Sequence, residues 1–239
     1  MITLAFDTSA KTASVALLRD GKPLALYSIE AGLTQSELIL PMAENMLKLA
    51  GLSFSDVGLL AVSAGPGSFT GVRIGISLVK GLALGRNIPI ASVSTVEALA
   101  ENFSGLNGII IPVMDARRGQ FYSAIFKGGE NGIERLTEDF ADSAPGILNR
   151  LSSLGLSGEP IFLVGDGYAS AKAAFSALSV SVNDTPQGLI SESAMSVGLV
   201  GLKKYADGDL KTDLEISPIY LRMPQAERER LEREKGEAK

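Results

Sequence analysis

Apolar residues along the chain fall into short runs of strand length, separated by longer stretches in which they recur every three to four positions. This pattern indicates a protein that mixes β-strands with amphipathic helices. In the first half we expect strands at residues 2–6, 13–18, 24–29, 58–62 and 88–93, helices at 34–50 and 70–85, a helical turn at 53–57, and a short helix that opens at Ser94.

The second half repeats this order of elements. We expect strands at residues 108–114, 120–126, 132–139, 160–164 and 180–182, and helices at 143–154, 168–178 and 191–206. The first strand of each half ends in an aspartate, Asp7 in one half and Asp115 in the other. This duplication predicts an α/β fold of two tandem domains facing a cleft, each domain built from a mixed β-sheet with flanking helices.

The segment Ser-Ala-Gly-Pro-Gly-Ser-Phe-Thr-Gly-Val-Arg-Ile-Gly at residues 63–75 links a strand to a helix. Gly65 and Gly67 permit positive φ angles, and Ser68 or Thr70 can accept a hydrogen bond from a free N–H at the helix start. A helix start of this kind could hold an anion, or the glycines could serve the turn alone. The spacing matches neither the P-loop nor the dinucleotide motif, so both interpretations stay open.

The helix at 70–85 is apolar around most of its circumference. Arg73, Ser77 and Lys80 form its one narrow polar stripe. A helix that packs on one face of a sheet needs only one apolar stripe. We therefore expect this helix to be buried on two sides, against its own sheet and against either a partner chain or a neighbouring helix of the same domain.

Composition narrows the possible functions. The chain of 239 residues has 22 basic and 27 acidic residues, a net charge of −5. This balance argues against a protein that binds nucleic acid by itself, because such proteins usually carry a basic face. No uninterrupted apolar run reaches membrane-spanning length and the first residues read as a strand, so we expect a cytoplasmic protein without a membrane segment.

The chain contains no histidine and no cysteine. These absences exclude a histidine general base, a Ser-His-Asp triad, a thiol nucleophile, and zinc or iron sites of the usual ligand sets. Carboxylates are the remaining metal ligands, and they suit Mg²⁺.

Polar side chains at the ends of strands are candidates for a nucleotide site. Asp7 could bind Mg²⁺ through water while nearby hydroxyls donate to a phosphate, or the same residues could simply form a polar strand end. The candidate set is Asp7, Thr8, Ser9, Asp115, Gly165 and Asp166. Such a site would suit an independent ATPase or small-molecule kinase of the actin-like superfamily. A third interpretation is a tRNA-contacting module acting through Arg73, Arg117 and Arg118.

Five motifs, AFDTS, SAGPGSFTGVRIG, DARRGQFY, VGDG and PIYLR, occur in this order along the chain. Their order and the chain length resemble the bacterial TsaB (YeaZ) family over roughly residues 1–222, and the glycine-rich motif is the most specific of them. The resemblance implies two actin-like (ribonuclease H-like) domains at residues 1–104 and 105–222, with helix 191–206 packing back on the first. Residues 223–239 would be a charged tail.

The resemblance also implies a function. TsaB proteins are accessory, non-catalytic relatives of TsaD, which transfers threonylcarbamoyl to adenosine 37 of tRNAs that read ANN codons. They pair with TsaD, support binding of the ATPase TsaE and self-associate. The chain would then require no cofactor of its own, with ATP or ADP and Mg²⁺ bound at the level of the complex, and would meet tRNA only through the complex.

One departure from TsaD supports this expectation. TsaD carries a His-x-x-x-His metal pair with a glutamate between the histidines. Here Glu97 matches the glutamate, whereas Thr95 and Leu99 stand where the histidines would be. The resemblance therefore implies that no metal binds there through imidazole.

Family dimers use helices of the N-terminal half, which suits the helix at 70–85 and the methionine-bearing helix at 34–50. Methionine adapts well to contact surfaces. The expected interface residues are Val72, Arg73, Ile74, Ser77, Leu78, Leu82, Met42 and Met46.

Overall fold

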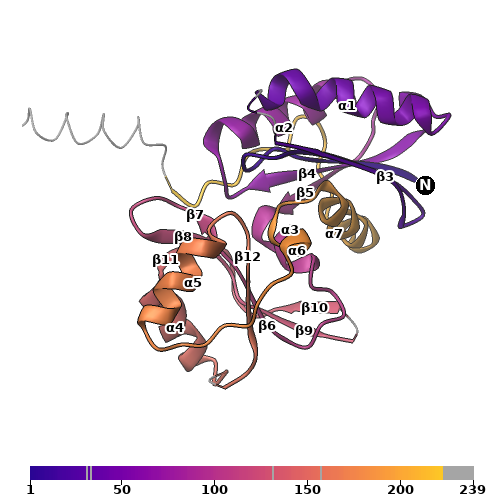
Figure 1. The fold of residues 1–239 in the computed structure, drawn as a ribbon. Helices are drawn as coiled ribbons and strands as arrows, with labels where there is room; N and C mark the ends of the chain where they lie inside the picture. The colour runs from indigo at the N-terminus through magenta and orange to yellow at the C-terminus, as the bar shows by residue number, and fades with distance from the viewer. Residues whose placement is uncertain (31, 33, 131, 157, 223–239) are drawn as a thin grey trace, which may run out of the picture.

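The computed structural model describes residues 1–222 apart from residues 31, 33, 131 and 157 (Figure 1). The first half contains β1 (Ile2–Asp7), β2 (Ala13–Arg19), β3 (Lys22–Ile29), α1 (Gln35–Leu49), η1 (Phe54–Asp56), β4 (Val57–Gly65), α2 (Phe69–Ala83), β5 (Ile90–Ser94) and α3 (Thr95–Glu101). Every element expected in this half is therefore present, with its ends shifted by a few residues.

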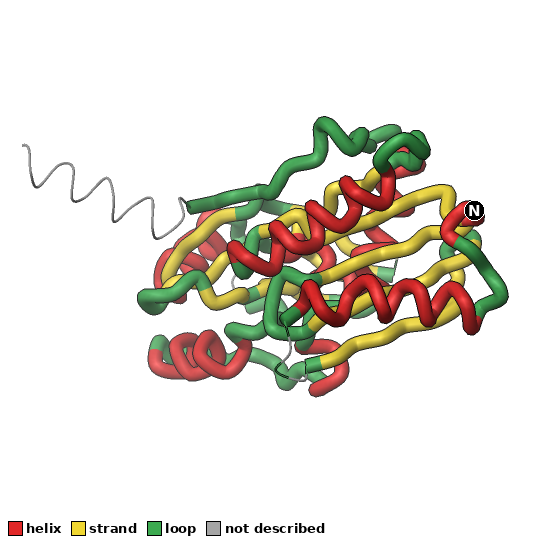
Figure 2. Tube along the Cα trace, turned by 90° about the horizontal axis from the view of Figure 1, so that it is seen from above, coloured by secondary structure: helices red, strands yellow, loops and turns green. Residues whose placement is uncertain are grey.

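The first half forms one mixed sheet with the strand order β3-β2-β1-β4-β5. β2 runs antiparallel to both β1 and β3, while β4 runs parallel to β1 and β5. The helices α1 and α2 pack on one face of this sheet, and Figure 2 shows them side by side across its strands. The expected mixed sheet is thus confirmed.

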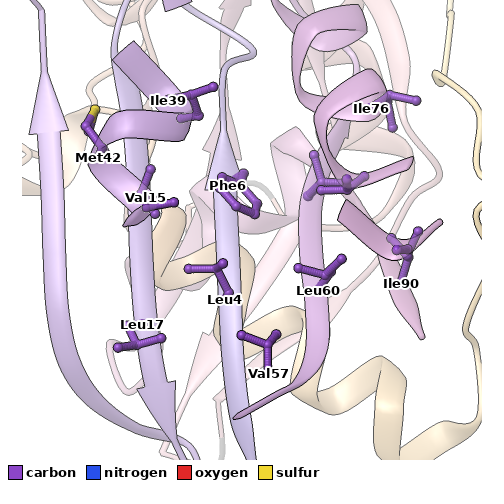
Figure 3. Close-up of a cluster of buried hydrophobic side chains, with 14 of the residues drawn as sticks. Leu4, Phe6, Val15, Leu17, Ile39, Met42, Val57, Leu60, Ile76 and Ile90 are labelled. Carbon is purple, nitrogen blue, oxygen red and sulfur yellow. The ribbon is translucent and has the colours of Figure 1, made fainter. Parts of the chain in front are cut away.

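The core beneath α1 and α2 follows from the alternation of side chains along the strands. Leu4 and Phe6 of β1 point to the same face, where they meet Ile39 of α1 and Ile76 of α2 (Figure 3). All four side chains are almost completely buried.

The opposite face of the sheet is covered by α7 (Ala194–Asp207), which comes from the end of the chain. Two glycines let this helix approach the sheet closely. A Cβ atom at Gly201 would lie 2.7 Å from the Cβ of Ala61, and one at Gly198 would overlap the side chain of Leu18. The position of α7 therefore depends on small residues both on the helix and on the strands.

The second half contains β6 (Gly108–Pro112), β7 (Met114–Asp115), β8 (Gln120–Ser123), β9 (Phe126–Gly129), β10 (Gly132–Arg135), β11 (Phe140–Ser143), α4 (Ala144–Ser153), β12 (Ile161–Val164), α5 (Tyr168–Ala177) and the short α6 (Gln187–Ile190). The strands form a sheet of order β10-β9-β6-β12 and a smaller sheet of order β11-β8-β7. α4 and α5 pack together over a separate apolar core that includes Ile147 and Phe175. α3 lies at the junction, where Leu99 and Phe103 pack with residues of β6 and β9.

Several expectations for the second half are corrected. The run at 120–126 divides between two sheets, because it is interrupted after β8 and resumes as β9. The strand expected at 132–139 ends at Arg135, and the next strand, β11, begins at Phe140 in the smaller sheet. The strand expected at 180–182 is wrong: among the described residues near it, only Asn183 forms an isolated bridge, with Phe162. The last helix begins at Ala194 rather than at residue 191, because Ser193 caps it.

None of the helices in the described part of the chain is long and apolar enough to cross a membrane. The charged tail expected at 223–239 lies outside the described residues. The division into domains at residues 104 and 105 stays a prediction.

Candidate functional site

A groove of about 510 Å³ lies between α1 and α2 on the outside of the first sheet. It is lined by Ser36, Ile39, Leu40, Phe69, Thr70, Arg73, Ile74, Ser77 and Leu78. Leu40 is 39% exposed, and Ile74 and Leu78 are half-buried. The groove is therefore lined by both apolar and polar side chains, and each of the two helices contributes some of each kind.

The predicted interface residues divide into two groups. Arg73 and Ser77 are exposed, and Ile74, Leu78 and Leu82 are half-buried, so all five are accessible on the outer side of α2. Four of them, all except Leu82, line the groove.

The other three predicted interface residues are buried inside the chain itself. Val72, Met42 and Met46 are 2%, 6% and 1% exposed. They belong to the core beneath the two helices. The expectation that the methionines form a contact surface is therefore wrong, because they occupy the inner face of α1.

Arg73 is held in one orientation by two aromatic rings. Its guanidinium carbon lies 3.7 Å from the centre of the Phe69 ring, and its Nε donates a hydrogen bond of 2.7 Å to the hydroxyl of Tyr220. The rings of Phe69 and Tyr220 stack with their centres 5.1 Å apart. This arrangement fixes a positive charge at the rim of the groove.

Phe69 and Leu40, which line the groove, and Tyr220, which binds Arg73, were not among the predicted site residues. Tyr220 lies in the motif PIYLR at residues 218–222. The presence of this family motif was the one sign in the sequence that the segment around Tyr220 has a role. The chain around Tyr220 is anchored on both sides, since the N–H of Ile219 donates to the carbonyl of Ala64 at 2.7 Å and Arg222 donates to the carbonyl of Ala116 at 2.9 Å.

The glycine-rich segment packs directly on the end of β1. The N–H of Ser68 donates to the carbonyl of Ser9 at 2.7 Å, and the Ser68 hydroxyl caps α2 by accepting from the N–H of Gly71. A Cβ atom at Gly71 would overlap the carbonyl oxygen of Thr8, and one at Gly67 would meet that of Ser9. The glycines are thus required for the close approach of two backbones.

The candidate nucleotide residues at the end of β1 face inward. Asp7, Thr8 and Ser9 are at most 1% exposed. The Thr8 hydroxyl donates to the carbonyl of Gly71 at 2.7 Å, and the Ser9 hydroxyl donates to Asp7 at 2.6 Å. Both hydroxyl protons are therefore already used within the chain.

Burial raises the pKa of Asp7, although hydrogen bonds from Ser9 oppose the shift. Its Oδ2 atom has no hydrogen-bond partner among the described residues, and the same holds for Oε1 of Glu192. Burial, together with the negative charge of Asp7, raises the pKa of Glu192 to about 8. Glu192 falls at the start of the helix predicted at 191–206 and was not among the predicted site residues, although its carboxyl is buried.

The second group of candidate nucleotide residues lies where β7 and β12 end. Oδ1 of Asp166 accepts a hydrogen bond of 3.0 Å from the N–H of Asp115. Burial raises the pKa of Asp166, and the hydrogen bond from Asp115 opposes this. Gly165 has a φ of +113°, and a Cβ atom there would lie 2.7 Å from the carbonyl oxygen of Val113. The structure therefore joins Asp115 to Asp166.

Glu97 on α3 takes part in an ion-pair network. Arg135 donates to Glu97 at 3.1 Å and to Asp139 at 2.6 Å, and Ser94 donates to Asp139 at 2.6 Å. Leu99 is buried in the core at the junction of the two halves, and Thr95 is also buried. Glu97 is thus bound to a cation of the chain itself.

The arginines proposed for tRNA contact lie apart from this network. Arg117 and Arg118 are exposed at the turn between β7 and β8, both with positive φ angles. The side chain of Asp115 supports the turn by accepting from the N–H of Arg117 at 2.7 Å. Arg73, the third member of that set, is engaged with Phe69 and Tyr220.

The sequence of this chain is similar to a known protein family and to several named proteins. A family model described as "TsaD: tRNA N6-adenosine threonylcarbamoyltransferase" matches residues 30–217. The "tRNA threonylcarbamoyladenosine biosynthesis protein TsaB" of Escherichia coli (strain K12) is 34% identical, over 93% of this chain and 95% of that protein. The protein of the same description in Haemophilus influenzae is 30% identical, over 92% of each chain.

Solved structures show the same fold. The structure described as "YeaZ from Pseudomonas aeruginosa" has a TM-score of 0.71 at 24% identity, covering 92% of this chain and 99% of that one. The activator of the 2-hydroxyisocaproyl-CoA dehydratase from Clostridium difficile, solved with bound ADPNP, has a TM-score of 0.51 at 13% identity and covers 92% of this chain and 100% of that one. These likenesses support the actin-like arrangement expected from the sequence.

Proposed function

The chain belongs to the TsaB (YeaZ) family and takes part in the biosynthesis of tRNA threonylcarbamoyladenosine, and we propose that it does so as an accessory subunit that binds TsaD through the groove between α1 and α2. In this proposal TsaD transfers threonylcarbamoyl to adenosine 37 of tRNAs that read ANN codons. The chain itself is not catalytic and requires no cofactor of its own.

The single observation that carries this proposal is the groove itself. Leu40, Ile74 and Leu78 leave apolar surface accessible side by side in the lining of one groove. Burying such a side chain fully stabilises an interface by up to about 1.5–3 kcal/mol before the costs of association. A helical partner with apolar side chains fits a groove between two helices.

Two features outside the groove agree with a non-catalytic, accessory role for this chain. The chain has no histidine, and Glu97 is held by Arg135 at 3.1 Å. We therefore assign the catalytic metal and the substrate tRNA to TsaD, and we expect ATP or ADP and Mg²⁺ to bind at the level of the complex. Binding of TsaE and self-association through the same groove complete the proposal.

The alternative, an independent ATPase or small-molecule kinase, is less well supported. The hydroxyls of Thr8 and Ser9 already donate to Gly71 and Asp7, so neither is free to donate to a phosphate without rearrangement. Calorimetry and a phosphate-release assay with ATP and Mg²⁺ on the isolated chain test this alternative. Heat of binding together with turnover would favour it over the accessory role.

The experiment that tests the groove is co-expression with TsaD and TsaE, followed by affinity purification. Leu40→Glu places a charge in the lining of the groove at an exposed position, so it should leave the fold intact. We expect at least a tenfold loss of co-purified TsaD and a matching loss of tRNA modification. Leu214→Glu is the matched control, because Leu214 is 85% exposed and does not line the groove.

The melting temperature of each variant separates a binding defect from a folding defect. A Leu40→Glu variant that melts like the wild type and still retains TsaD in full would show that the groove is not the interface.

A further inference from the structure

Arg73 is the only charged residue among the described residues that line the groove between α1 and α2. Along α2 it lies one turn after Phe69 and one turn before Ser77. Ile74 and Leu78 form the neighbouring row of side chains on the same helix and also line the groove. A positive charge therefore lies directly beside the apolar side chains that a partner would cover.

The guanidinium of Arg73 is oriented by its own chain but is not neutralised by it. It packs on the ring of Phe69, and its Nε donates to the hydroxyl of Tyr220. Its two terminal nitrogens donate to no residue in the described part of the chain. No carboxylate of that part forms an ion pair with Arg73 either.

Two other arginines of this chain show how such a group is completed. The guanidinium carbon of Arg150 lies 4.3 Å from the centre of the Phe140 ring, and Arg150 donates to Asp142 at 3.3 Å. Arg135 is likewise stacked on an aromatic ring and bound to carboxylates. In both, a ring covers one face of the guanidinium and a carboxylate accepts from its edge. Arg73 has the rings but lacks the carboxylate.

A partner that covers the groove removes water from Arg73. A charged group that loses water without gaining a hydrogen-bond acceptor destabilises a complex. A carboxylate is the best acceptor, because its two oxygens match the fork of N–H groups and its charge neutralises the guanidinium. A helix can present such a residue beside apolar residues that lie three or four positions away.

We propose, on the premise that TsaD binds in this groove, that the helix of TsaD that fills it carries an aspartate or glutamate at the edge of its apolar stripe. This carboxylate accepts hydrogen bonds from the terminal nitrogens of Arg73, while the apolar side chains meet Ile74 and Leu78. Arg73 then selects the partner helix by charge and fixes its position along α2, because Phe69 and Tyr220 hold the guanidinium in one place.

Surface plasmon resonance with immobilised TsaD and the full-length chain tests this pairing. Arg73→Gln removes the charge and should weaken binding by about tenfold, whereas Arg73→Glu brings two carboxylates together and should weaken it by about a hundredfold. Arg73→Lys keeps the charge and should bind with an affinity between those of the wild type and Arg73→Gln. Lys48→Glu is the control, because Lys48 is exposed at the other end of α1 and does not line the groove.

Charge exchange then identifies the carboxylate on TsaD. Each aspartate and glutamate of TsaD is replaced in turn by lysine, and every variant is measured against Arg73→Glu and against the wild-type chain. We expect one replacement to strengthen binding to Arg73→Glu by about tenfold and to weaken binding to the wild type. A purely structural role of Arg73 would not produce this reciprocal pattern.

Equal affinities of Arg73→Gln and Arg73→Glu would overturn the proposal, and so would the absence of any restoring replacement in TsaD. Leu40→Glu distinguishes these results from a failure of the groove itself. If Leu40→Glu loses TsaD while every Arg73 variant binds it like the wild type, the groove stands as the interface and the charge pair is refuted. If Leu40→Glu retains TsaD in full, the groove is refuted as well.

Discussion

Glu192 and Asp7 are buried close enough to each other for the charge of Asp7 to help raise the pKa of Glu192 to about 8. Each carboxyl has one oxygen without a hydrogen-bond partner in the described part of the chain. Asp7 ends the first strand of the sheet, whereas Glu192 immediately precedes the capped start of α7. Two acids from distant parts of the sequence thus lie near each other in the interior.

The free energy of unfolding should therefore fall as the pH rises. The pKa of Glu192 is about 8 in the folded chain, above its ordinary value of 4.5. Between these two pH values the unfolded chain releases a proton that the folded chain retains. The contribution of Glu192 is complete below pH 4.5 and is lost at about 1.4 kcal/mol per pH unit until pH 8 is reached. The raised pKa of Asp7 acts in the same direction.

Glu192→Gln should flatten this dependence and make the chain more stable than the wild type at pH 8, by a few kcal/mol. Urea denaturation at a series of pH values measures both effects. Glu138→Gln, at an exposed carboxyl, is the control and should follow the wild type. Parallel curves for the wild type and Glu192→Gln would refute the assigned interaction.

Gly71→Ala should destabilise the chain strongly. A methyl group there would overlap the carbonyl oxygen of Thr8, and both are backbone positions that cannot move independently. We expect a loss of about 3 kcal/mol or more, since overpacking a rigid contact forces the backbone apart. Gly81→Ala on the same helix is the matched control, because nothing lies within 4 Å of its added methyl group. That substitution should stabilise by up to about 1 kcal/mol. Equal effects of the two substitutions in thermal denaturation would contradict the packing described here.

Tyr220 should control the affinity of the groove for its partner through Arg73. Tyr220→Phe keeps the ring that stacks on Phe69 but removes the hydrogen bond of 2.7 Å to Arg73. A loss of about 1 kcal/mol in binding TsaD is expected, or roughly fivefold in the dissociation constant. Tyr220→Ala removes the ring as well and should cost more.

Surface plasmon resonance with immobilised TsaD provides the measurement for the Tyr220 variants. Tyr205→Phe on α7 is the control, because Tyr205 is exposed to the same degree as Tyr220, whereas it is the hydroxyl of Tyr220 that accepts the hydrogen bond from Arg73. Unchanged affinity in Tyr220→Ala would mean that the orientation of Arg73 does not matter for binding.

The sequence by itself determined most local structure. Periodic apolar positions predicted the strands and helices of the first half, and the glycines of residues 63–75 predicted a tight turn that opens a helix. These features depend on neighbouring residues, because side-chain period and backbone freedom are local properties. The same reasoning failed at 120–126, where the run is interrupted between β8 and β9, and at 180–182, where no strand forms in the described residues.

Tertiary structure decided which side chains reach the surface and which distant residues meet. Met42 and Met46 looked suited to a contact surface, yet they face the sheet because α1 turns that side inward. Tyr220 meets Arg73, and Glu192 lies near Asp7, only because the chain from Glu192 through α7 to Tyr220 returns to the first sheet. Such contacts depend on how complete elements pack, and no pattern within a single element contains that information.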